Sequence, residues 1–281
     1  MKKVAIQGIR GSFHDIAAHQ YFKGEELDIV CCDSFEDVFA TVSQDGSCLA
    51  FVAIENTIAG SLLHNYELLR QSALCVVGEH KLRISHSLVC LPEDDWDTLT
   101  EVHSHPVALM QCSAFLQKHP QLKVVQGSDT ASSAKEIADG HLRGRCAICH
   151  KDNAAAFGLK VLAEEIEDNQ HNYTRFLMCS NPKKVSHLRH IEDCNKASLV
   201  FALPHKEGSL SQVLSVLSFY SINLTKIQSL PIIGKEWEYM FYIDVVYDTL
   251  SRFRQSIDAI TPLTSELKIL GEYIEAKETN R

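Results

Sequence analysis

The stretch Ser34-Phe35-Glu36-Asp37-Val38-Phe39-Ala40-Thr41-Val42-Ser43-Gln44 indicates the fold class of the first part of the chain. Its apolar residues recur at helical spacing and fall on one helix face, namely Phe35, Val38, Phe39 and Val42. Ser34 is followed three residues later by Asp37, a pattern that begins helices. Strand-like runs at 27–32 and 49–54 flank the stretch. This alternation predicts an α/β fold with a largely parallel sheet.

The same alternation extends through residues 1–180. We predict further strands at 2–7, 82–91, 101–104, 122–126, 145–149 and 174–179. Helices are expected to begin after Ser12, at Ser61 and at Pro106, because serine suits the N-cap and proline suits the first helical position. The helix from Pro106 is expected to continue to Phe115.

A different unit follows residue 195. Residues 181–195 are polar and basic without a clear period, and we interpret them as a linker. Strands are then predicted at 197–203, 222–229, 238–247 and 267–274. One helix opens at Ser209, with Gln212 as its capping-box partner, and a second carries Phe253. The resulting order βαββαβ predicts a ferredoxin-like α+β unit, whose open edge is suited to dimer formation.

Composition limits the classes of function. The 281 residues include 27 Lys and Arg against 36 Asp and Glu, which gives a formal net charge of −9. Nucleic-acid binding needs a basic surface, so we expect no nucleic-acid partner. No apolar run approaches the ~20 residues that span a bilayer. Polar residues interrupt the N-terminal apolar run from Gln7 onward, so we expect no membrane association and a cytoplasmic protein.

Ten cysteines lie mostly inside apolar segments, as buried cysteines do in a reducing compartment. The segment Cys146-Ala147-Ile148-Cys149-His150 matches the C-x-x-C-H pattern of haem attachment. It also has the composition of a strand, and no second pair follows at zinc spacing. We therefore interpret these cysteines as strand residues and predict no metal site.

Four segments carry a more specific pattern. They are Gly8-Ile9-Arg10-Gly11-Ser12-Phe13, Ile54-Glu55-Asn56-Thr57-Ile58-Ala59-Gly60-Ser61, Ser104-His105-Pro106-Val107-Ala108-Leu109-Met110-Gln111-Cys112 and Asn172-Tyr173-Thr174-Arg175-Phe176-Leu177. In this order and spacing they resemble the prephenate dehydratase family. The C-terminal unit resembles an ACT domain, because Gly208-Ser209-Leu210 stands where that family has Gly-Ala-Leu and Asn223-Leu224-Thr225-Lys226-Ile227 matches its second strand.

The resemblance implies a catalytic domain over 1–180, with two lobes like those of periplasmic binding proteins. The lobes would be about 1–80 with 158–180, and 81–157, and the site would lie in the cleft between them. The implied reaction removes water and carbon dioxide from prephenate to give phenylpyruvate. No cofactor is implied, because aromatisation of the ring drives the reaction. Residues 196–281 would form the ACT domain, which would assemble the chain into a homodimer or homotetramer.

The resemblance also implies the site residues. Thr174 is the expected catalytic residue, a hydrogen-bond donor to the leaving hydroxyl. The residues expected to contact substrate are Ser12, Glu55, Asn56, Thr57, Gly60, Ser61, Ser104, Gln111 and Phe176. His64 is an alternative proton source. Strand alternation favours Arg175 facing away from substrate, whereas Glu55 either holds its loop or acts in its protonated form.

L-Phenylalanine is the implied effector, and the residues expected to bind it are Gly208, Ser209, Leu210, Asn223, Leu224 and Ser229. The family's second strand ends Glu-Ser-Arg-Pro, but here the segment is Gln228-Ser229-Leu230-Pro231, without either charge. A helix N-terminus accepts a carboxylate without a basic side chain, so we expect binding to survive. The departures are expected to alter coupling between the domains instead.

Two alternatives remain open. Nothing in the motifs separates prephenate from arogenate, in which an amino group replaces the keto group. The other alternative is a non-catalytic regulator that senses amino acids through the same cleft. A binding protein would not need the complete segment Asn172-Tyr173-Thr174-Arg175-Phe176, which favours the enzyme.

Overall fold

The computed structural model describes residues 1–188, 190–232, 234 and 238–276. Residue 189 of the expected linker, and residues 233, 235–237 and 277–281 of the expected C-terminal domain, lie outside the described residues. The chain divides into two compact units, each assembled from segments distant in sequence. The first unit comprises Met1–Val38, Glu55–Ser61 and Lys81–Phe176, and the second comprises Phe39–Ile54, Leu62–His80 and Leu177–Arg281.

The N-terminal part of the first unit is a strand–helix–strand motif. Strands β1 (Lys2–Gln7) and β2 (Leu27–Cys32) pair in parallel, and helix α1 (Phe13–Tyr21) connects them. The middle of β1 is fully buried, which explains its apolar run. Ser12 is the N-cap of α1, as predicted, and accepts a hydrogen bond from Asp15 N at 3.4 Å.

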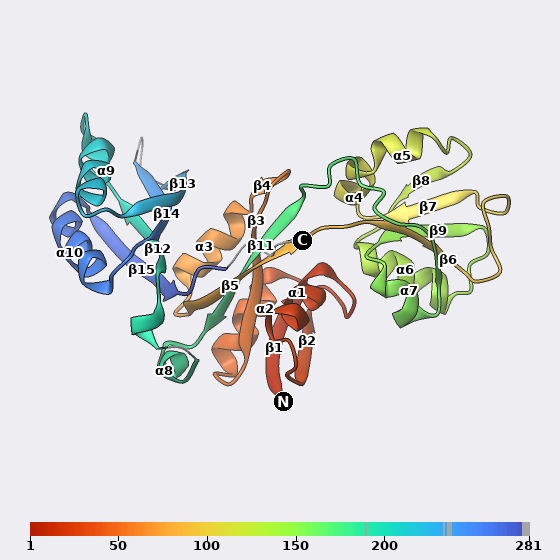
Figure 1. Ribbon diagram of the computed structural model, residues 1–281, viewed down its shortest axis with the longest axis horizontal. Coiled ribbons are helices and arrows are strands. Elements are labelled where there is room, and N and C mark those ends of the chain that lie inside the picture. The colour runs from red at the N-terminus through yellow and green to blue at the C-terminus, as the bar shows by residue number, and fades with distance from the viewer. Residues whose placement is uncertain (189, 233, 235–237, 277–281) are drawn as a thin grey trace. The chain divides into compact units, whose positions relative to one another are not determined.

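The first unit also holds a five-stranded sheet with the order β10-β6-β9-β7-β8 (Figure 1). Its strands are β6 (Ser87–Cys90), β7 (Glu101–Ser104), β8 (Lys123–Gln126), β9 (Arg145–Cys149) and β10 (Lys160–Ala163). Alternate residues of β6 and β9 enter two different apolar clusters. One cluster includes residues of α4 (Pro106–Gln111), and the other includes residues of α6 (Thr130–Asp139) and α7 (Asp152–Phe157). The sheet is therefore covered on both faces, as its nearly continuous apolar strands require.

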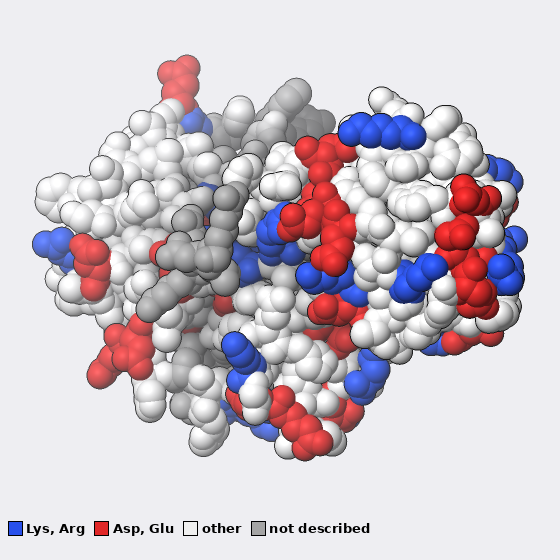
Figure 2. Space-filling view, turned by 45° about the vertical axis from the view of Figure 1, so that its right-hand side comes forward, with Lys and Arg blue, Asp and Glu red and all other residues white. Residues whose placement is uncertain are grey.

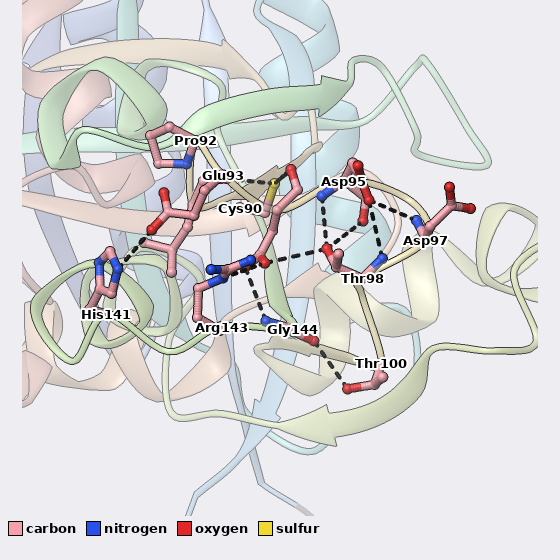
Figure 3. Close-up of polar contacts among 12 residues, drawn as sticks. Cys90, Pro92, Glu93, Asp95, Asp97, Thr98, Thr100, His141, Arg143 and Gly144 are labelled. Carbon is pink, nitrogen blue, oxygen red and sulfur yellow. Dashed lines mark hydrogen bonds and ion pairs between the residues drawn. The ribbon is translucent and has the colours of Figure 1, made fainter.

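Buried Asp94 fixes the loop between β6 and β7. Its carboxylate accepts hydrogen bonds from Arg143 Nε at 2.9 Å, from Gly144 N at 3.0 Å and from Thr98 Oγ1 at 3.3 Å. Figure 3 shows Arg143 and Gly144 beside this loop, which carries Thr98, together with the exposed pair Glu93 and His141. A buried carboxylate with three donors stabilises the strand ends that it joins.

Strands of the second unit follow the order β13-β14-β12-β15-β5-β11-β3. They are β3 (Leu49–Asn56), β5 (Cys75–Arg83), β11 (Tyr173–Ser180), β12 (Lys196–Ala202), β13 (Asn223–Pro231), β14 (Tyr239–Val246) and β15 (Glu266–Tyr273). From β12 to β15, helices α9 (Ser209–Phe219) and α10 (Leu250–Ile260) complete the predicted order βαββαβ. Both helices pack on one apolar cluster with these strands. Helix α2 (Phe35–Gln44) follows β2, and helix α3 (Leu63–Gln71) follows the short strand β4 (Gly60–Ser61).

The predicted strand 82–91 is wrong in its bounds. Strand β5 starts at Cys75 and ends at Arg83, and β6 begins only at Ser87. Between them, Ile84 N donates to Asn172 O at 2.8 Å and His86 N donates to Glu167 Oε2 at 2.9 Å. These long-range bonds take the backbone out of the sheet ladder, which a local pattern does not reveal.

Three helix predictions also need correction. Ser61 does not begin a helix, since it lies in the short strand β4 (Gly60–Ser61) and α3 starts at Leu63. The helix from Pro106 ends at Gln111, and α5 (Ser113–Gln117) begins a new helix where Asp168 accepts from Ala114 N at 3.0 Å. The Ser209 capping box is absent, because Ser209 Oγ donates to Lys206 O at 2.9 Å instead.

Short helical turns occupy part of the expected linker: η1 (Pro182–Lys184), α8 (Val185–Leu188) and η2 (Ile191–Asp193). No helix within the described residues is both long and apolar enough to cross a membrane.

Figure 2 shows acidic and basic side chains interspersed on the visible face, without a basic stripe there. That face lacks the electrostatic footprint of nucleic-acid binding.

Candidate active site

Asn56 ends strand β3, and its side chain organises the loop that follows. Its Oδ1 accepts hydrogen bonds from Ile58 N at 3.0 Å and Ala59 N at 2.8 Å. Gly60 has a φ of 82°, which lets the chain turn back so that β4 pairs with Glu55 and Asn56. Because backbone N–H groups only donate, they fix the amide oxygen on this side. The amide nitrogen of Asn56 consequently points the other way.

That nitrogen joins the loop to strand β11. Asn56 Nδ2 lies 3.0 Å from Thr174 Oγ1, 2.7 Å from Asn172 Oδ1 and 3.3 Å from Tyr173 O. Thr57 reinforces the contact, since Thr57 N donates to Tyr173 O and Tyr173 N donates to Thr57 Oγ1, both at 2.9 Å. Two of the motifs that carried the family resemblance are therefore bonded to each other.

The same network continues to a third motif. Asn172 Nδ2 donates to Gln111 Oε1 at 3.1 Å, and His86 Nε2 lies 3.1 Å from the same oxygen. Asn172, Gln111 and His86 are all buried. We call this series of hydrogen-bonded residues the amide chain. Its members, in order, are Thr174, Asn56, Asn172, Gln111 and His86.

The direction of every hydrogen bond in the amide chain follows from the Asn56 loop. With Asn56 Nδ2 as donor, Thr174 Oγ1 and Asn172 Oδ1 are acceptors, and Asn172 Nδ2 must donate to Gln111. Among the described residues, none accepts from the Thr174 hydroxyl, and none accepts from Gln111 Nε2. The amide chain therefore leaves one hydroxyl and one amide NH₂ group as donors for a ligand.

The remaining expected substrate contacts lie in varied settings. Buried Ser104 donates to Ile148 O at 2.6 Å, so its hydroxyl proton already has an acceptor. Ser12 is buried at the N-terminus of α1, and Phe176 is buried with its ring 5.1 Å from that of His14. Glu55 and Ser61 are half-buried across the β3–β4 turn, and Thr57 and Gly60 are exposed. Arg175 is buried, and His64 is exposed in the first turn of α3.

Sequence reasoning missed His86, the histidine that is bonded into the amide chain. His86 is 1% exposed, and burial lowers its pKa despite the bond to Gln111. The available signal was the polar pair Ser85 and His86 inside the run predicted as one strand. His14 is a half-buried histidine of this unit, and its removal from solvent lowers its pKa to about 4.

The two cysteines of the C-x-x-C-H segment lie on a strand, as predicted. Cys146 and Cys149 lie on β9 with no exposed surface, and burial raises the pKa of the Cys149 thiol to about 12. A thiol of this kind stays protonated at neutral pH and is a poor metal ligand. The described residues contain no cluster of His, Cys, Asp and Glu that suits a metal ion.

A pocket of about 130 Å³ lies at the start of α9 in the second unit. It is lined by Leu203, Pro204, His205, Lys206, Ser209, Leu210, Tyr239 and Phe241. Two of the expected effector residues, Ser209 and Leu210, line it, while Asn223, Leu224 and Ser229 do not. Gly208 precedes α9 with a φ of 75°, a left-handed conformation that suits glycine.

Helix α3 of the second unit carries a strongly bonded carboxylate, Glu67. Arg70 Nε donates to Glu67 Oε2 at 2.9 Å, and Tyr242 Oη donates to the same oxygen at 2.8 Å. These bonds, that from Arg70 above all, lower the pKa of Glu67 to about 2. Lys268 Nζ donates to Arg70 O at 2.7 Å and Ser72 O at 3.0 Å, so β15 also holds the end of this helix.

Comparison with known sequences identifies the motifs. The sequence model of the prephenate dehydratase family matches residues 4–184. A bifunctional chorismate mutase/prephenate dehydratase of Buchnera aphidicola is 32% identical over 276 residues, which are 97% of this chain and 71% of that protein. Arogenate dehydratase 1 of Petunia hybrida is 35% identical over 289 residues, which are 96% of this chain and 66% of that protein.

Solved structures agree with the sequence match. A prephenate dehydratase of Arthrobacter aurescens, in complex with L-Phe, has a TM-score of 0.85 at 26% identity. The match covers 97% of this chain and 90% of that chain. A protein described as a novel type of quorum quenching acylase has a TM-score of 0.86 at 26% identity and covers 98% of both chains. Similarity of fold alone does not separate these two activities, so the residues of the site must do so.

Proposed function

The chain belongs to the prephenate dehydratase family, and we propose that Thr174, Asn56 and Gln111 form the site at which it converts prephenate to phenylpyruvate. The observation that carries this proposal is the hydrogen bond from Asn56 Nδ2 to Thr174 Oγ1 at 3.0 Å. A hydroxyl that accepts this bond keeps its proton for another acceptor. The reaction needs such a donor at the oxygen that leaves the ring.

Thr174 would act on the leaving hydroxyl of prephenate. The bond between ring carbon and hydroxyl oxygen breaks, the Thr174 hydroxyl passes its proton to the departing oxygen, which leaves as water, and Thr174 regains a proton from solvent. The bond to the ring carboxylate breaks in the same conversion, its electron pair enters the ring, and carbon dioxide leaves. Placement of a donor of this kind is worth roughly 10²–10⁴ in rate. Aromatisation supplies the driving force, so we propose that no cofactor takes part.

Gln111 would bind one carboxylate of the dianionic substrate. Its oxygen is held by Asn172 and His86, and its NH₂ group has no acceptor among the described residues. A neutral amide binds an anion without the cost of an unpaired buried cation when the site is empty. The other residues expected to contact substrate, including Ser12, Glu55, Thr57, Gly60, Ser61, Ser104 and Phe176, remain part of the proposed site.

One assay tests the activity and its alternatives. Purified protein is mixed with prephenate, and phenylpyruvate is measured by its ultraviolet absorbance. Arogenate in a parallel reaction gives phenylalanine, which chromatography separates, so the ratio of the two rates assigns the substrate. An N-acyl homoserine lactone serves as the third substrate, because it tests for the activity of a quorum quenching acylase. Turnover of the lactone without turnover of either dehydratase substrate would overturn the proposal.

We also propose that residues 196–281 are an ACT domain and that L-phenylalanine binds it. The order βαββαβ supports the domain, and the pocket at the start of α9 supports the ligand. Leu210 and Phe241 would contact the aromatic ring, and Lys206 would attract the carboxylate. Calorimetry with phenylalanine tests this, and absence of heat at millimolar ligand would overturn it.

Assembly through the same domain is part of the proposal. Strand β13 is at the end of the strand order, and its residues alternate between half-buried and exposed. An edge strand with unpaired backbone groups is suited to pairing with a second copy. Light scattering of the full chain should report two or four subunits, and a monomer would contradict the assembly.

We also propose that the catalytic part has the two lobes of a periplasmic binding protein.

A further inference from the structure

His86 lies at the end of the amide chain. Its ring Nε2 is 3.1 Å from Gln111 Oε1, and its backbone N–H donates to Glu167 Oε2 at 2.9 Å. Ile166 N donates to His86 O at 3.0 Å, and the ring meets that of Phe13 edge to face at 5.6 Å. Backbone and ring are thus both fixed, so His86 holds one orientation toward Gln111.

The polarity of the amide chain determines the tautomer of this ring. Gln111 Oε1 already accepts from Asn172 Nδ2, so it must accept from His86 as well. The proton of the neutral imidazole is therefore on Nε2. The other ring nitrogen, Nδ1, is buried and has no hydrogen-bond partner among the described residues. Gln111 is thus the side chain that selects the tautomer.

We propose that His86 is a positioning residue for the dehydratase reaction, which acts by holding the Gln111 amide oxygen so that its NH₂ group faces the substrate. The proposal rests on the proposed function of Gln111. If the proton moved to Nδ1, Nε2 would become an acceptor and would repel Gln111 Oε1. A rotated Gln111 would then face Asn172 Nδ2 with its own NH₂ group, which places two donors together.

The charged and titratable groups around His86 do not replace this role. Glu167 binds the backbone of His86 and is itself paired with Arg83 at 2.9 Å. His150 also meets the ring of Phe13, at 6.0 Å, and its charged form would lower the pKa of His86 further. Burial keeps His86 neutral at neutral pH, so it holds Gln111 as a neutral donor rather than as a cation.

Two substitutions separate positioning from a structural role. His86→Phe keeps a ring but removes the donor, and His86→Gln keeps an amide donor. We expect His86→Phe to raise KM for prephenate about ten- to hundredfold, the value of a hydrogen bond to a charged group. The kcat should change less, because the carboxylate is bound in both ground and transition states. His86→Gln should restore most of the lost affinity.

The decisive measurement repeats His86→Phe in a Gln111→Ala background. If His86 acts through Gln111, its substitution has little further effect on KM there. An equal loss in both backgrounds would overturn the proposal. Nitrogen NMR of the wild-type imidazole gives a readout that needs no activity, with protonated Nε2 and unprotonated Nδ1 expected. The opposite tautomer would overturn the positioning role even if prephenate is converted. Failure to convert prephenate with the expected tautomer would overturn the proposed function, and of the present proposal it would leave only the orientation of Gln111 by His86.

Discussion

Tyr242 Oη donates a hydrogen bond of 2.8 Å to Glu67 Oε2, and this bond joins strand β14 to helix α3 within the second unit. The ring of Tyr242 is also 5.3 Å from that of Tyr66 on the same helix. Helix α3 is in turn bonded to β3, because Asn65 Nδ2 donates to Ala53 O at 2.7 Å. Strand β3 ends in Asn56. A change in β14 therefore has a bonded route toward the strand that carries the proposed site.

The first prediction concerns this route. Tyr242→Phe removes only the hydroxyl, so Glu67 loses one donor while the ring contact with Tyr66 remains. We expect the phenylalanine concentration for half inhibition to rise several-fold, with kcat in the absence of phenylalanine unchanged. Coupling depends on contacts that differ between two conformations, and this bond is a candidate for such a contact. Activity titrated with phenylalanine measures the effect.

Tyr220→Phe is the matched control for this prediction. Tyr220 lies on the same domain, and its ring contacts Phe219 at 5.3 Å. Its substitution should leave inhibition unchanged. If phenylalanine inhibits the Tyr242→Phe variant as strongly as it inhibits the wild type, while calorimetry shows normal phenylalanine binding, the route through Glu67 does not carry the coupling.

The second prediction tests the direction of the amide chain. Asn56→Asp keeps an oxygen for Ile58 N and Ala59 N but replaces the NH₂ donor with an acceptor. The Thr174 hydroxyl would then donate to the aspartate and turn its proton away from the substrate. We expect kcat to fall about 10²-fold or more, as for Thr174→Val, whereas Thr174→Ser should retain most of the activity.

The added charge needs its own control. Asn169→Asp places a negative charge on the neighbouring exposed loop, and its Oδ1 keeps the bond to His171 N at 2.9 Å. That variant should keep its kcat. A comparable loss of kcat in both variants would mean that repulsion of the dianion, rather than the orientation of Thr174, explains the effect.

Local patterns in the sequence predicted the local parts of this structure. The Ser34 cap is present, since Asp37 N donates to Ser34 Oγ at 3.1 Å, and α2 runs from Phe35 to Gln44 as predicted. The order βαββαβ is also confirmed. These features depend on residues within a few positions of one another, where helical and strand periodicity is informative.

Such local patterns could not predict the contacts between residues that are far apart in the sequence. Asn56 and Asn172 are 116 positions apart, and only the family resemblance placed their motifs in one site. His86 and Asn172 had no expected role, because a buried histidine or asparagine has no periodic signal. The errors at Ser61 and Ser209 have the same cause, since competing backbone bonds took the positions that a helix cap would have used.

The third prediction is a pH dependence of stability. The pKa of Glu67 is lowered from 4.5 to about 2 in the folded state, so the folded state favours the charged form. A depressed carboxyl pKa stabilises the fold fully above the unfolded value, and this contribution is lost as pH falls toward the folded value. Glu67→Gln should therefore lower the free energy of unfolding most above pH 4.5, and the difference should shrink toward pH 2.

Urea unfolding at several pH values measures this difference. Glu164→Gln is the control, since Glu164 is exposed and pairs with Lys151 at 3.1 Å. Exposed pairs contribute little, so that variant should track the wild type at every pH. A difference between Glu67→Gln and the wild type that stays constant from neutral to strongly acidic pH would contradict the role of the Glu67 charge.

The fourth prediction concerns the junction of strands β15 and β5. Gly271 pairs with Val76 in parallel, and a Cβ at Gly271 would lie 2.2 Å from Val76 O and 2.7 Å from its Cα. Backbone atoms of a buried strand cannot rotate away as a side chain can, so Gly271→Ala must separate the two strands. We expect a loss of about 1–3 kcal/mol in the free energy of unfolding, as for other overpacked sites.

Gly46→Ala is the matched control, because its Cβ would meet nothing closer than Asn181 Nδ2 at 3.6 Å. Chemical denaturation of both variants measures the difference, and equal stability of the two would show that β5 and β15 tolerate separation at this point.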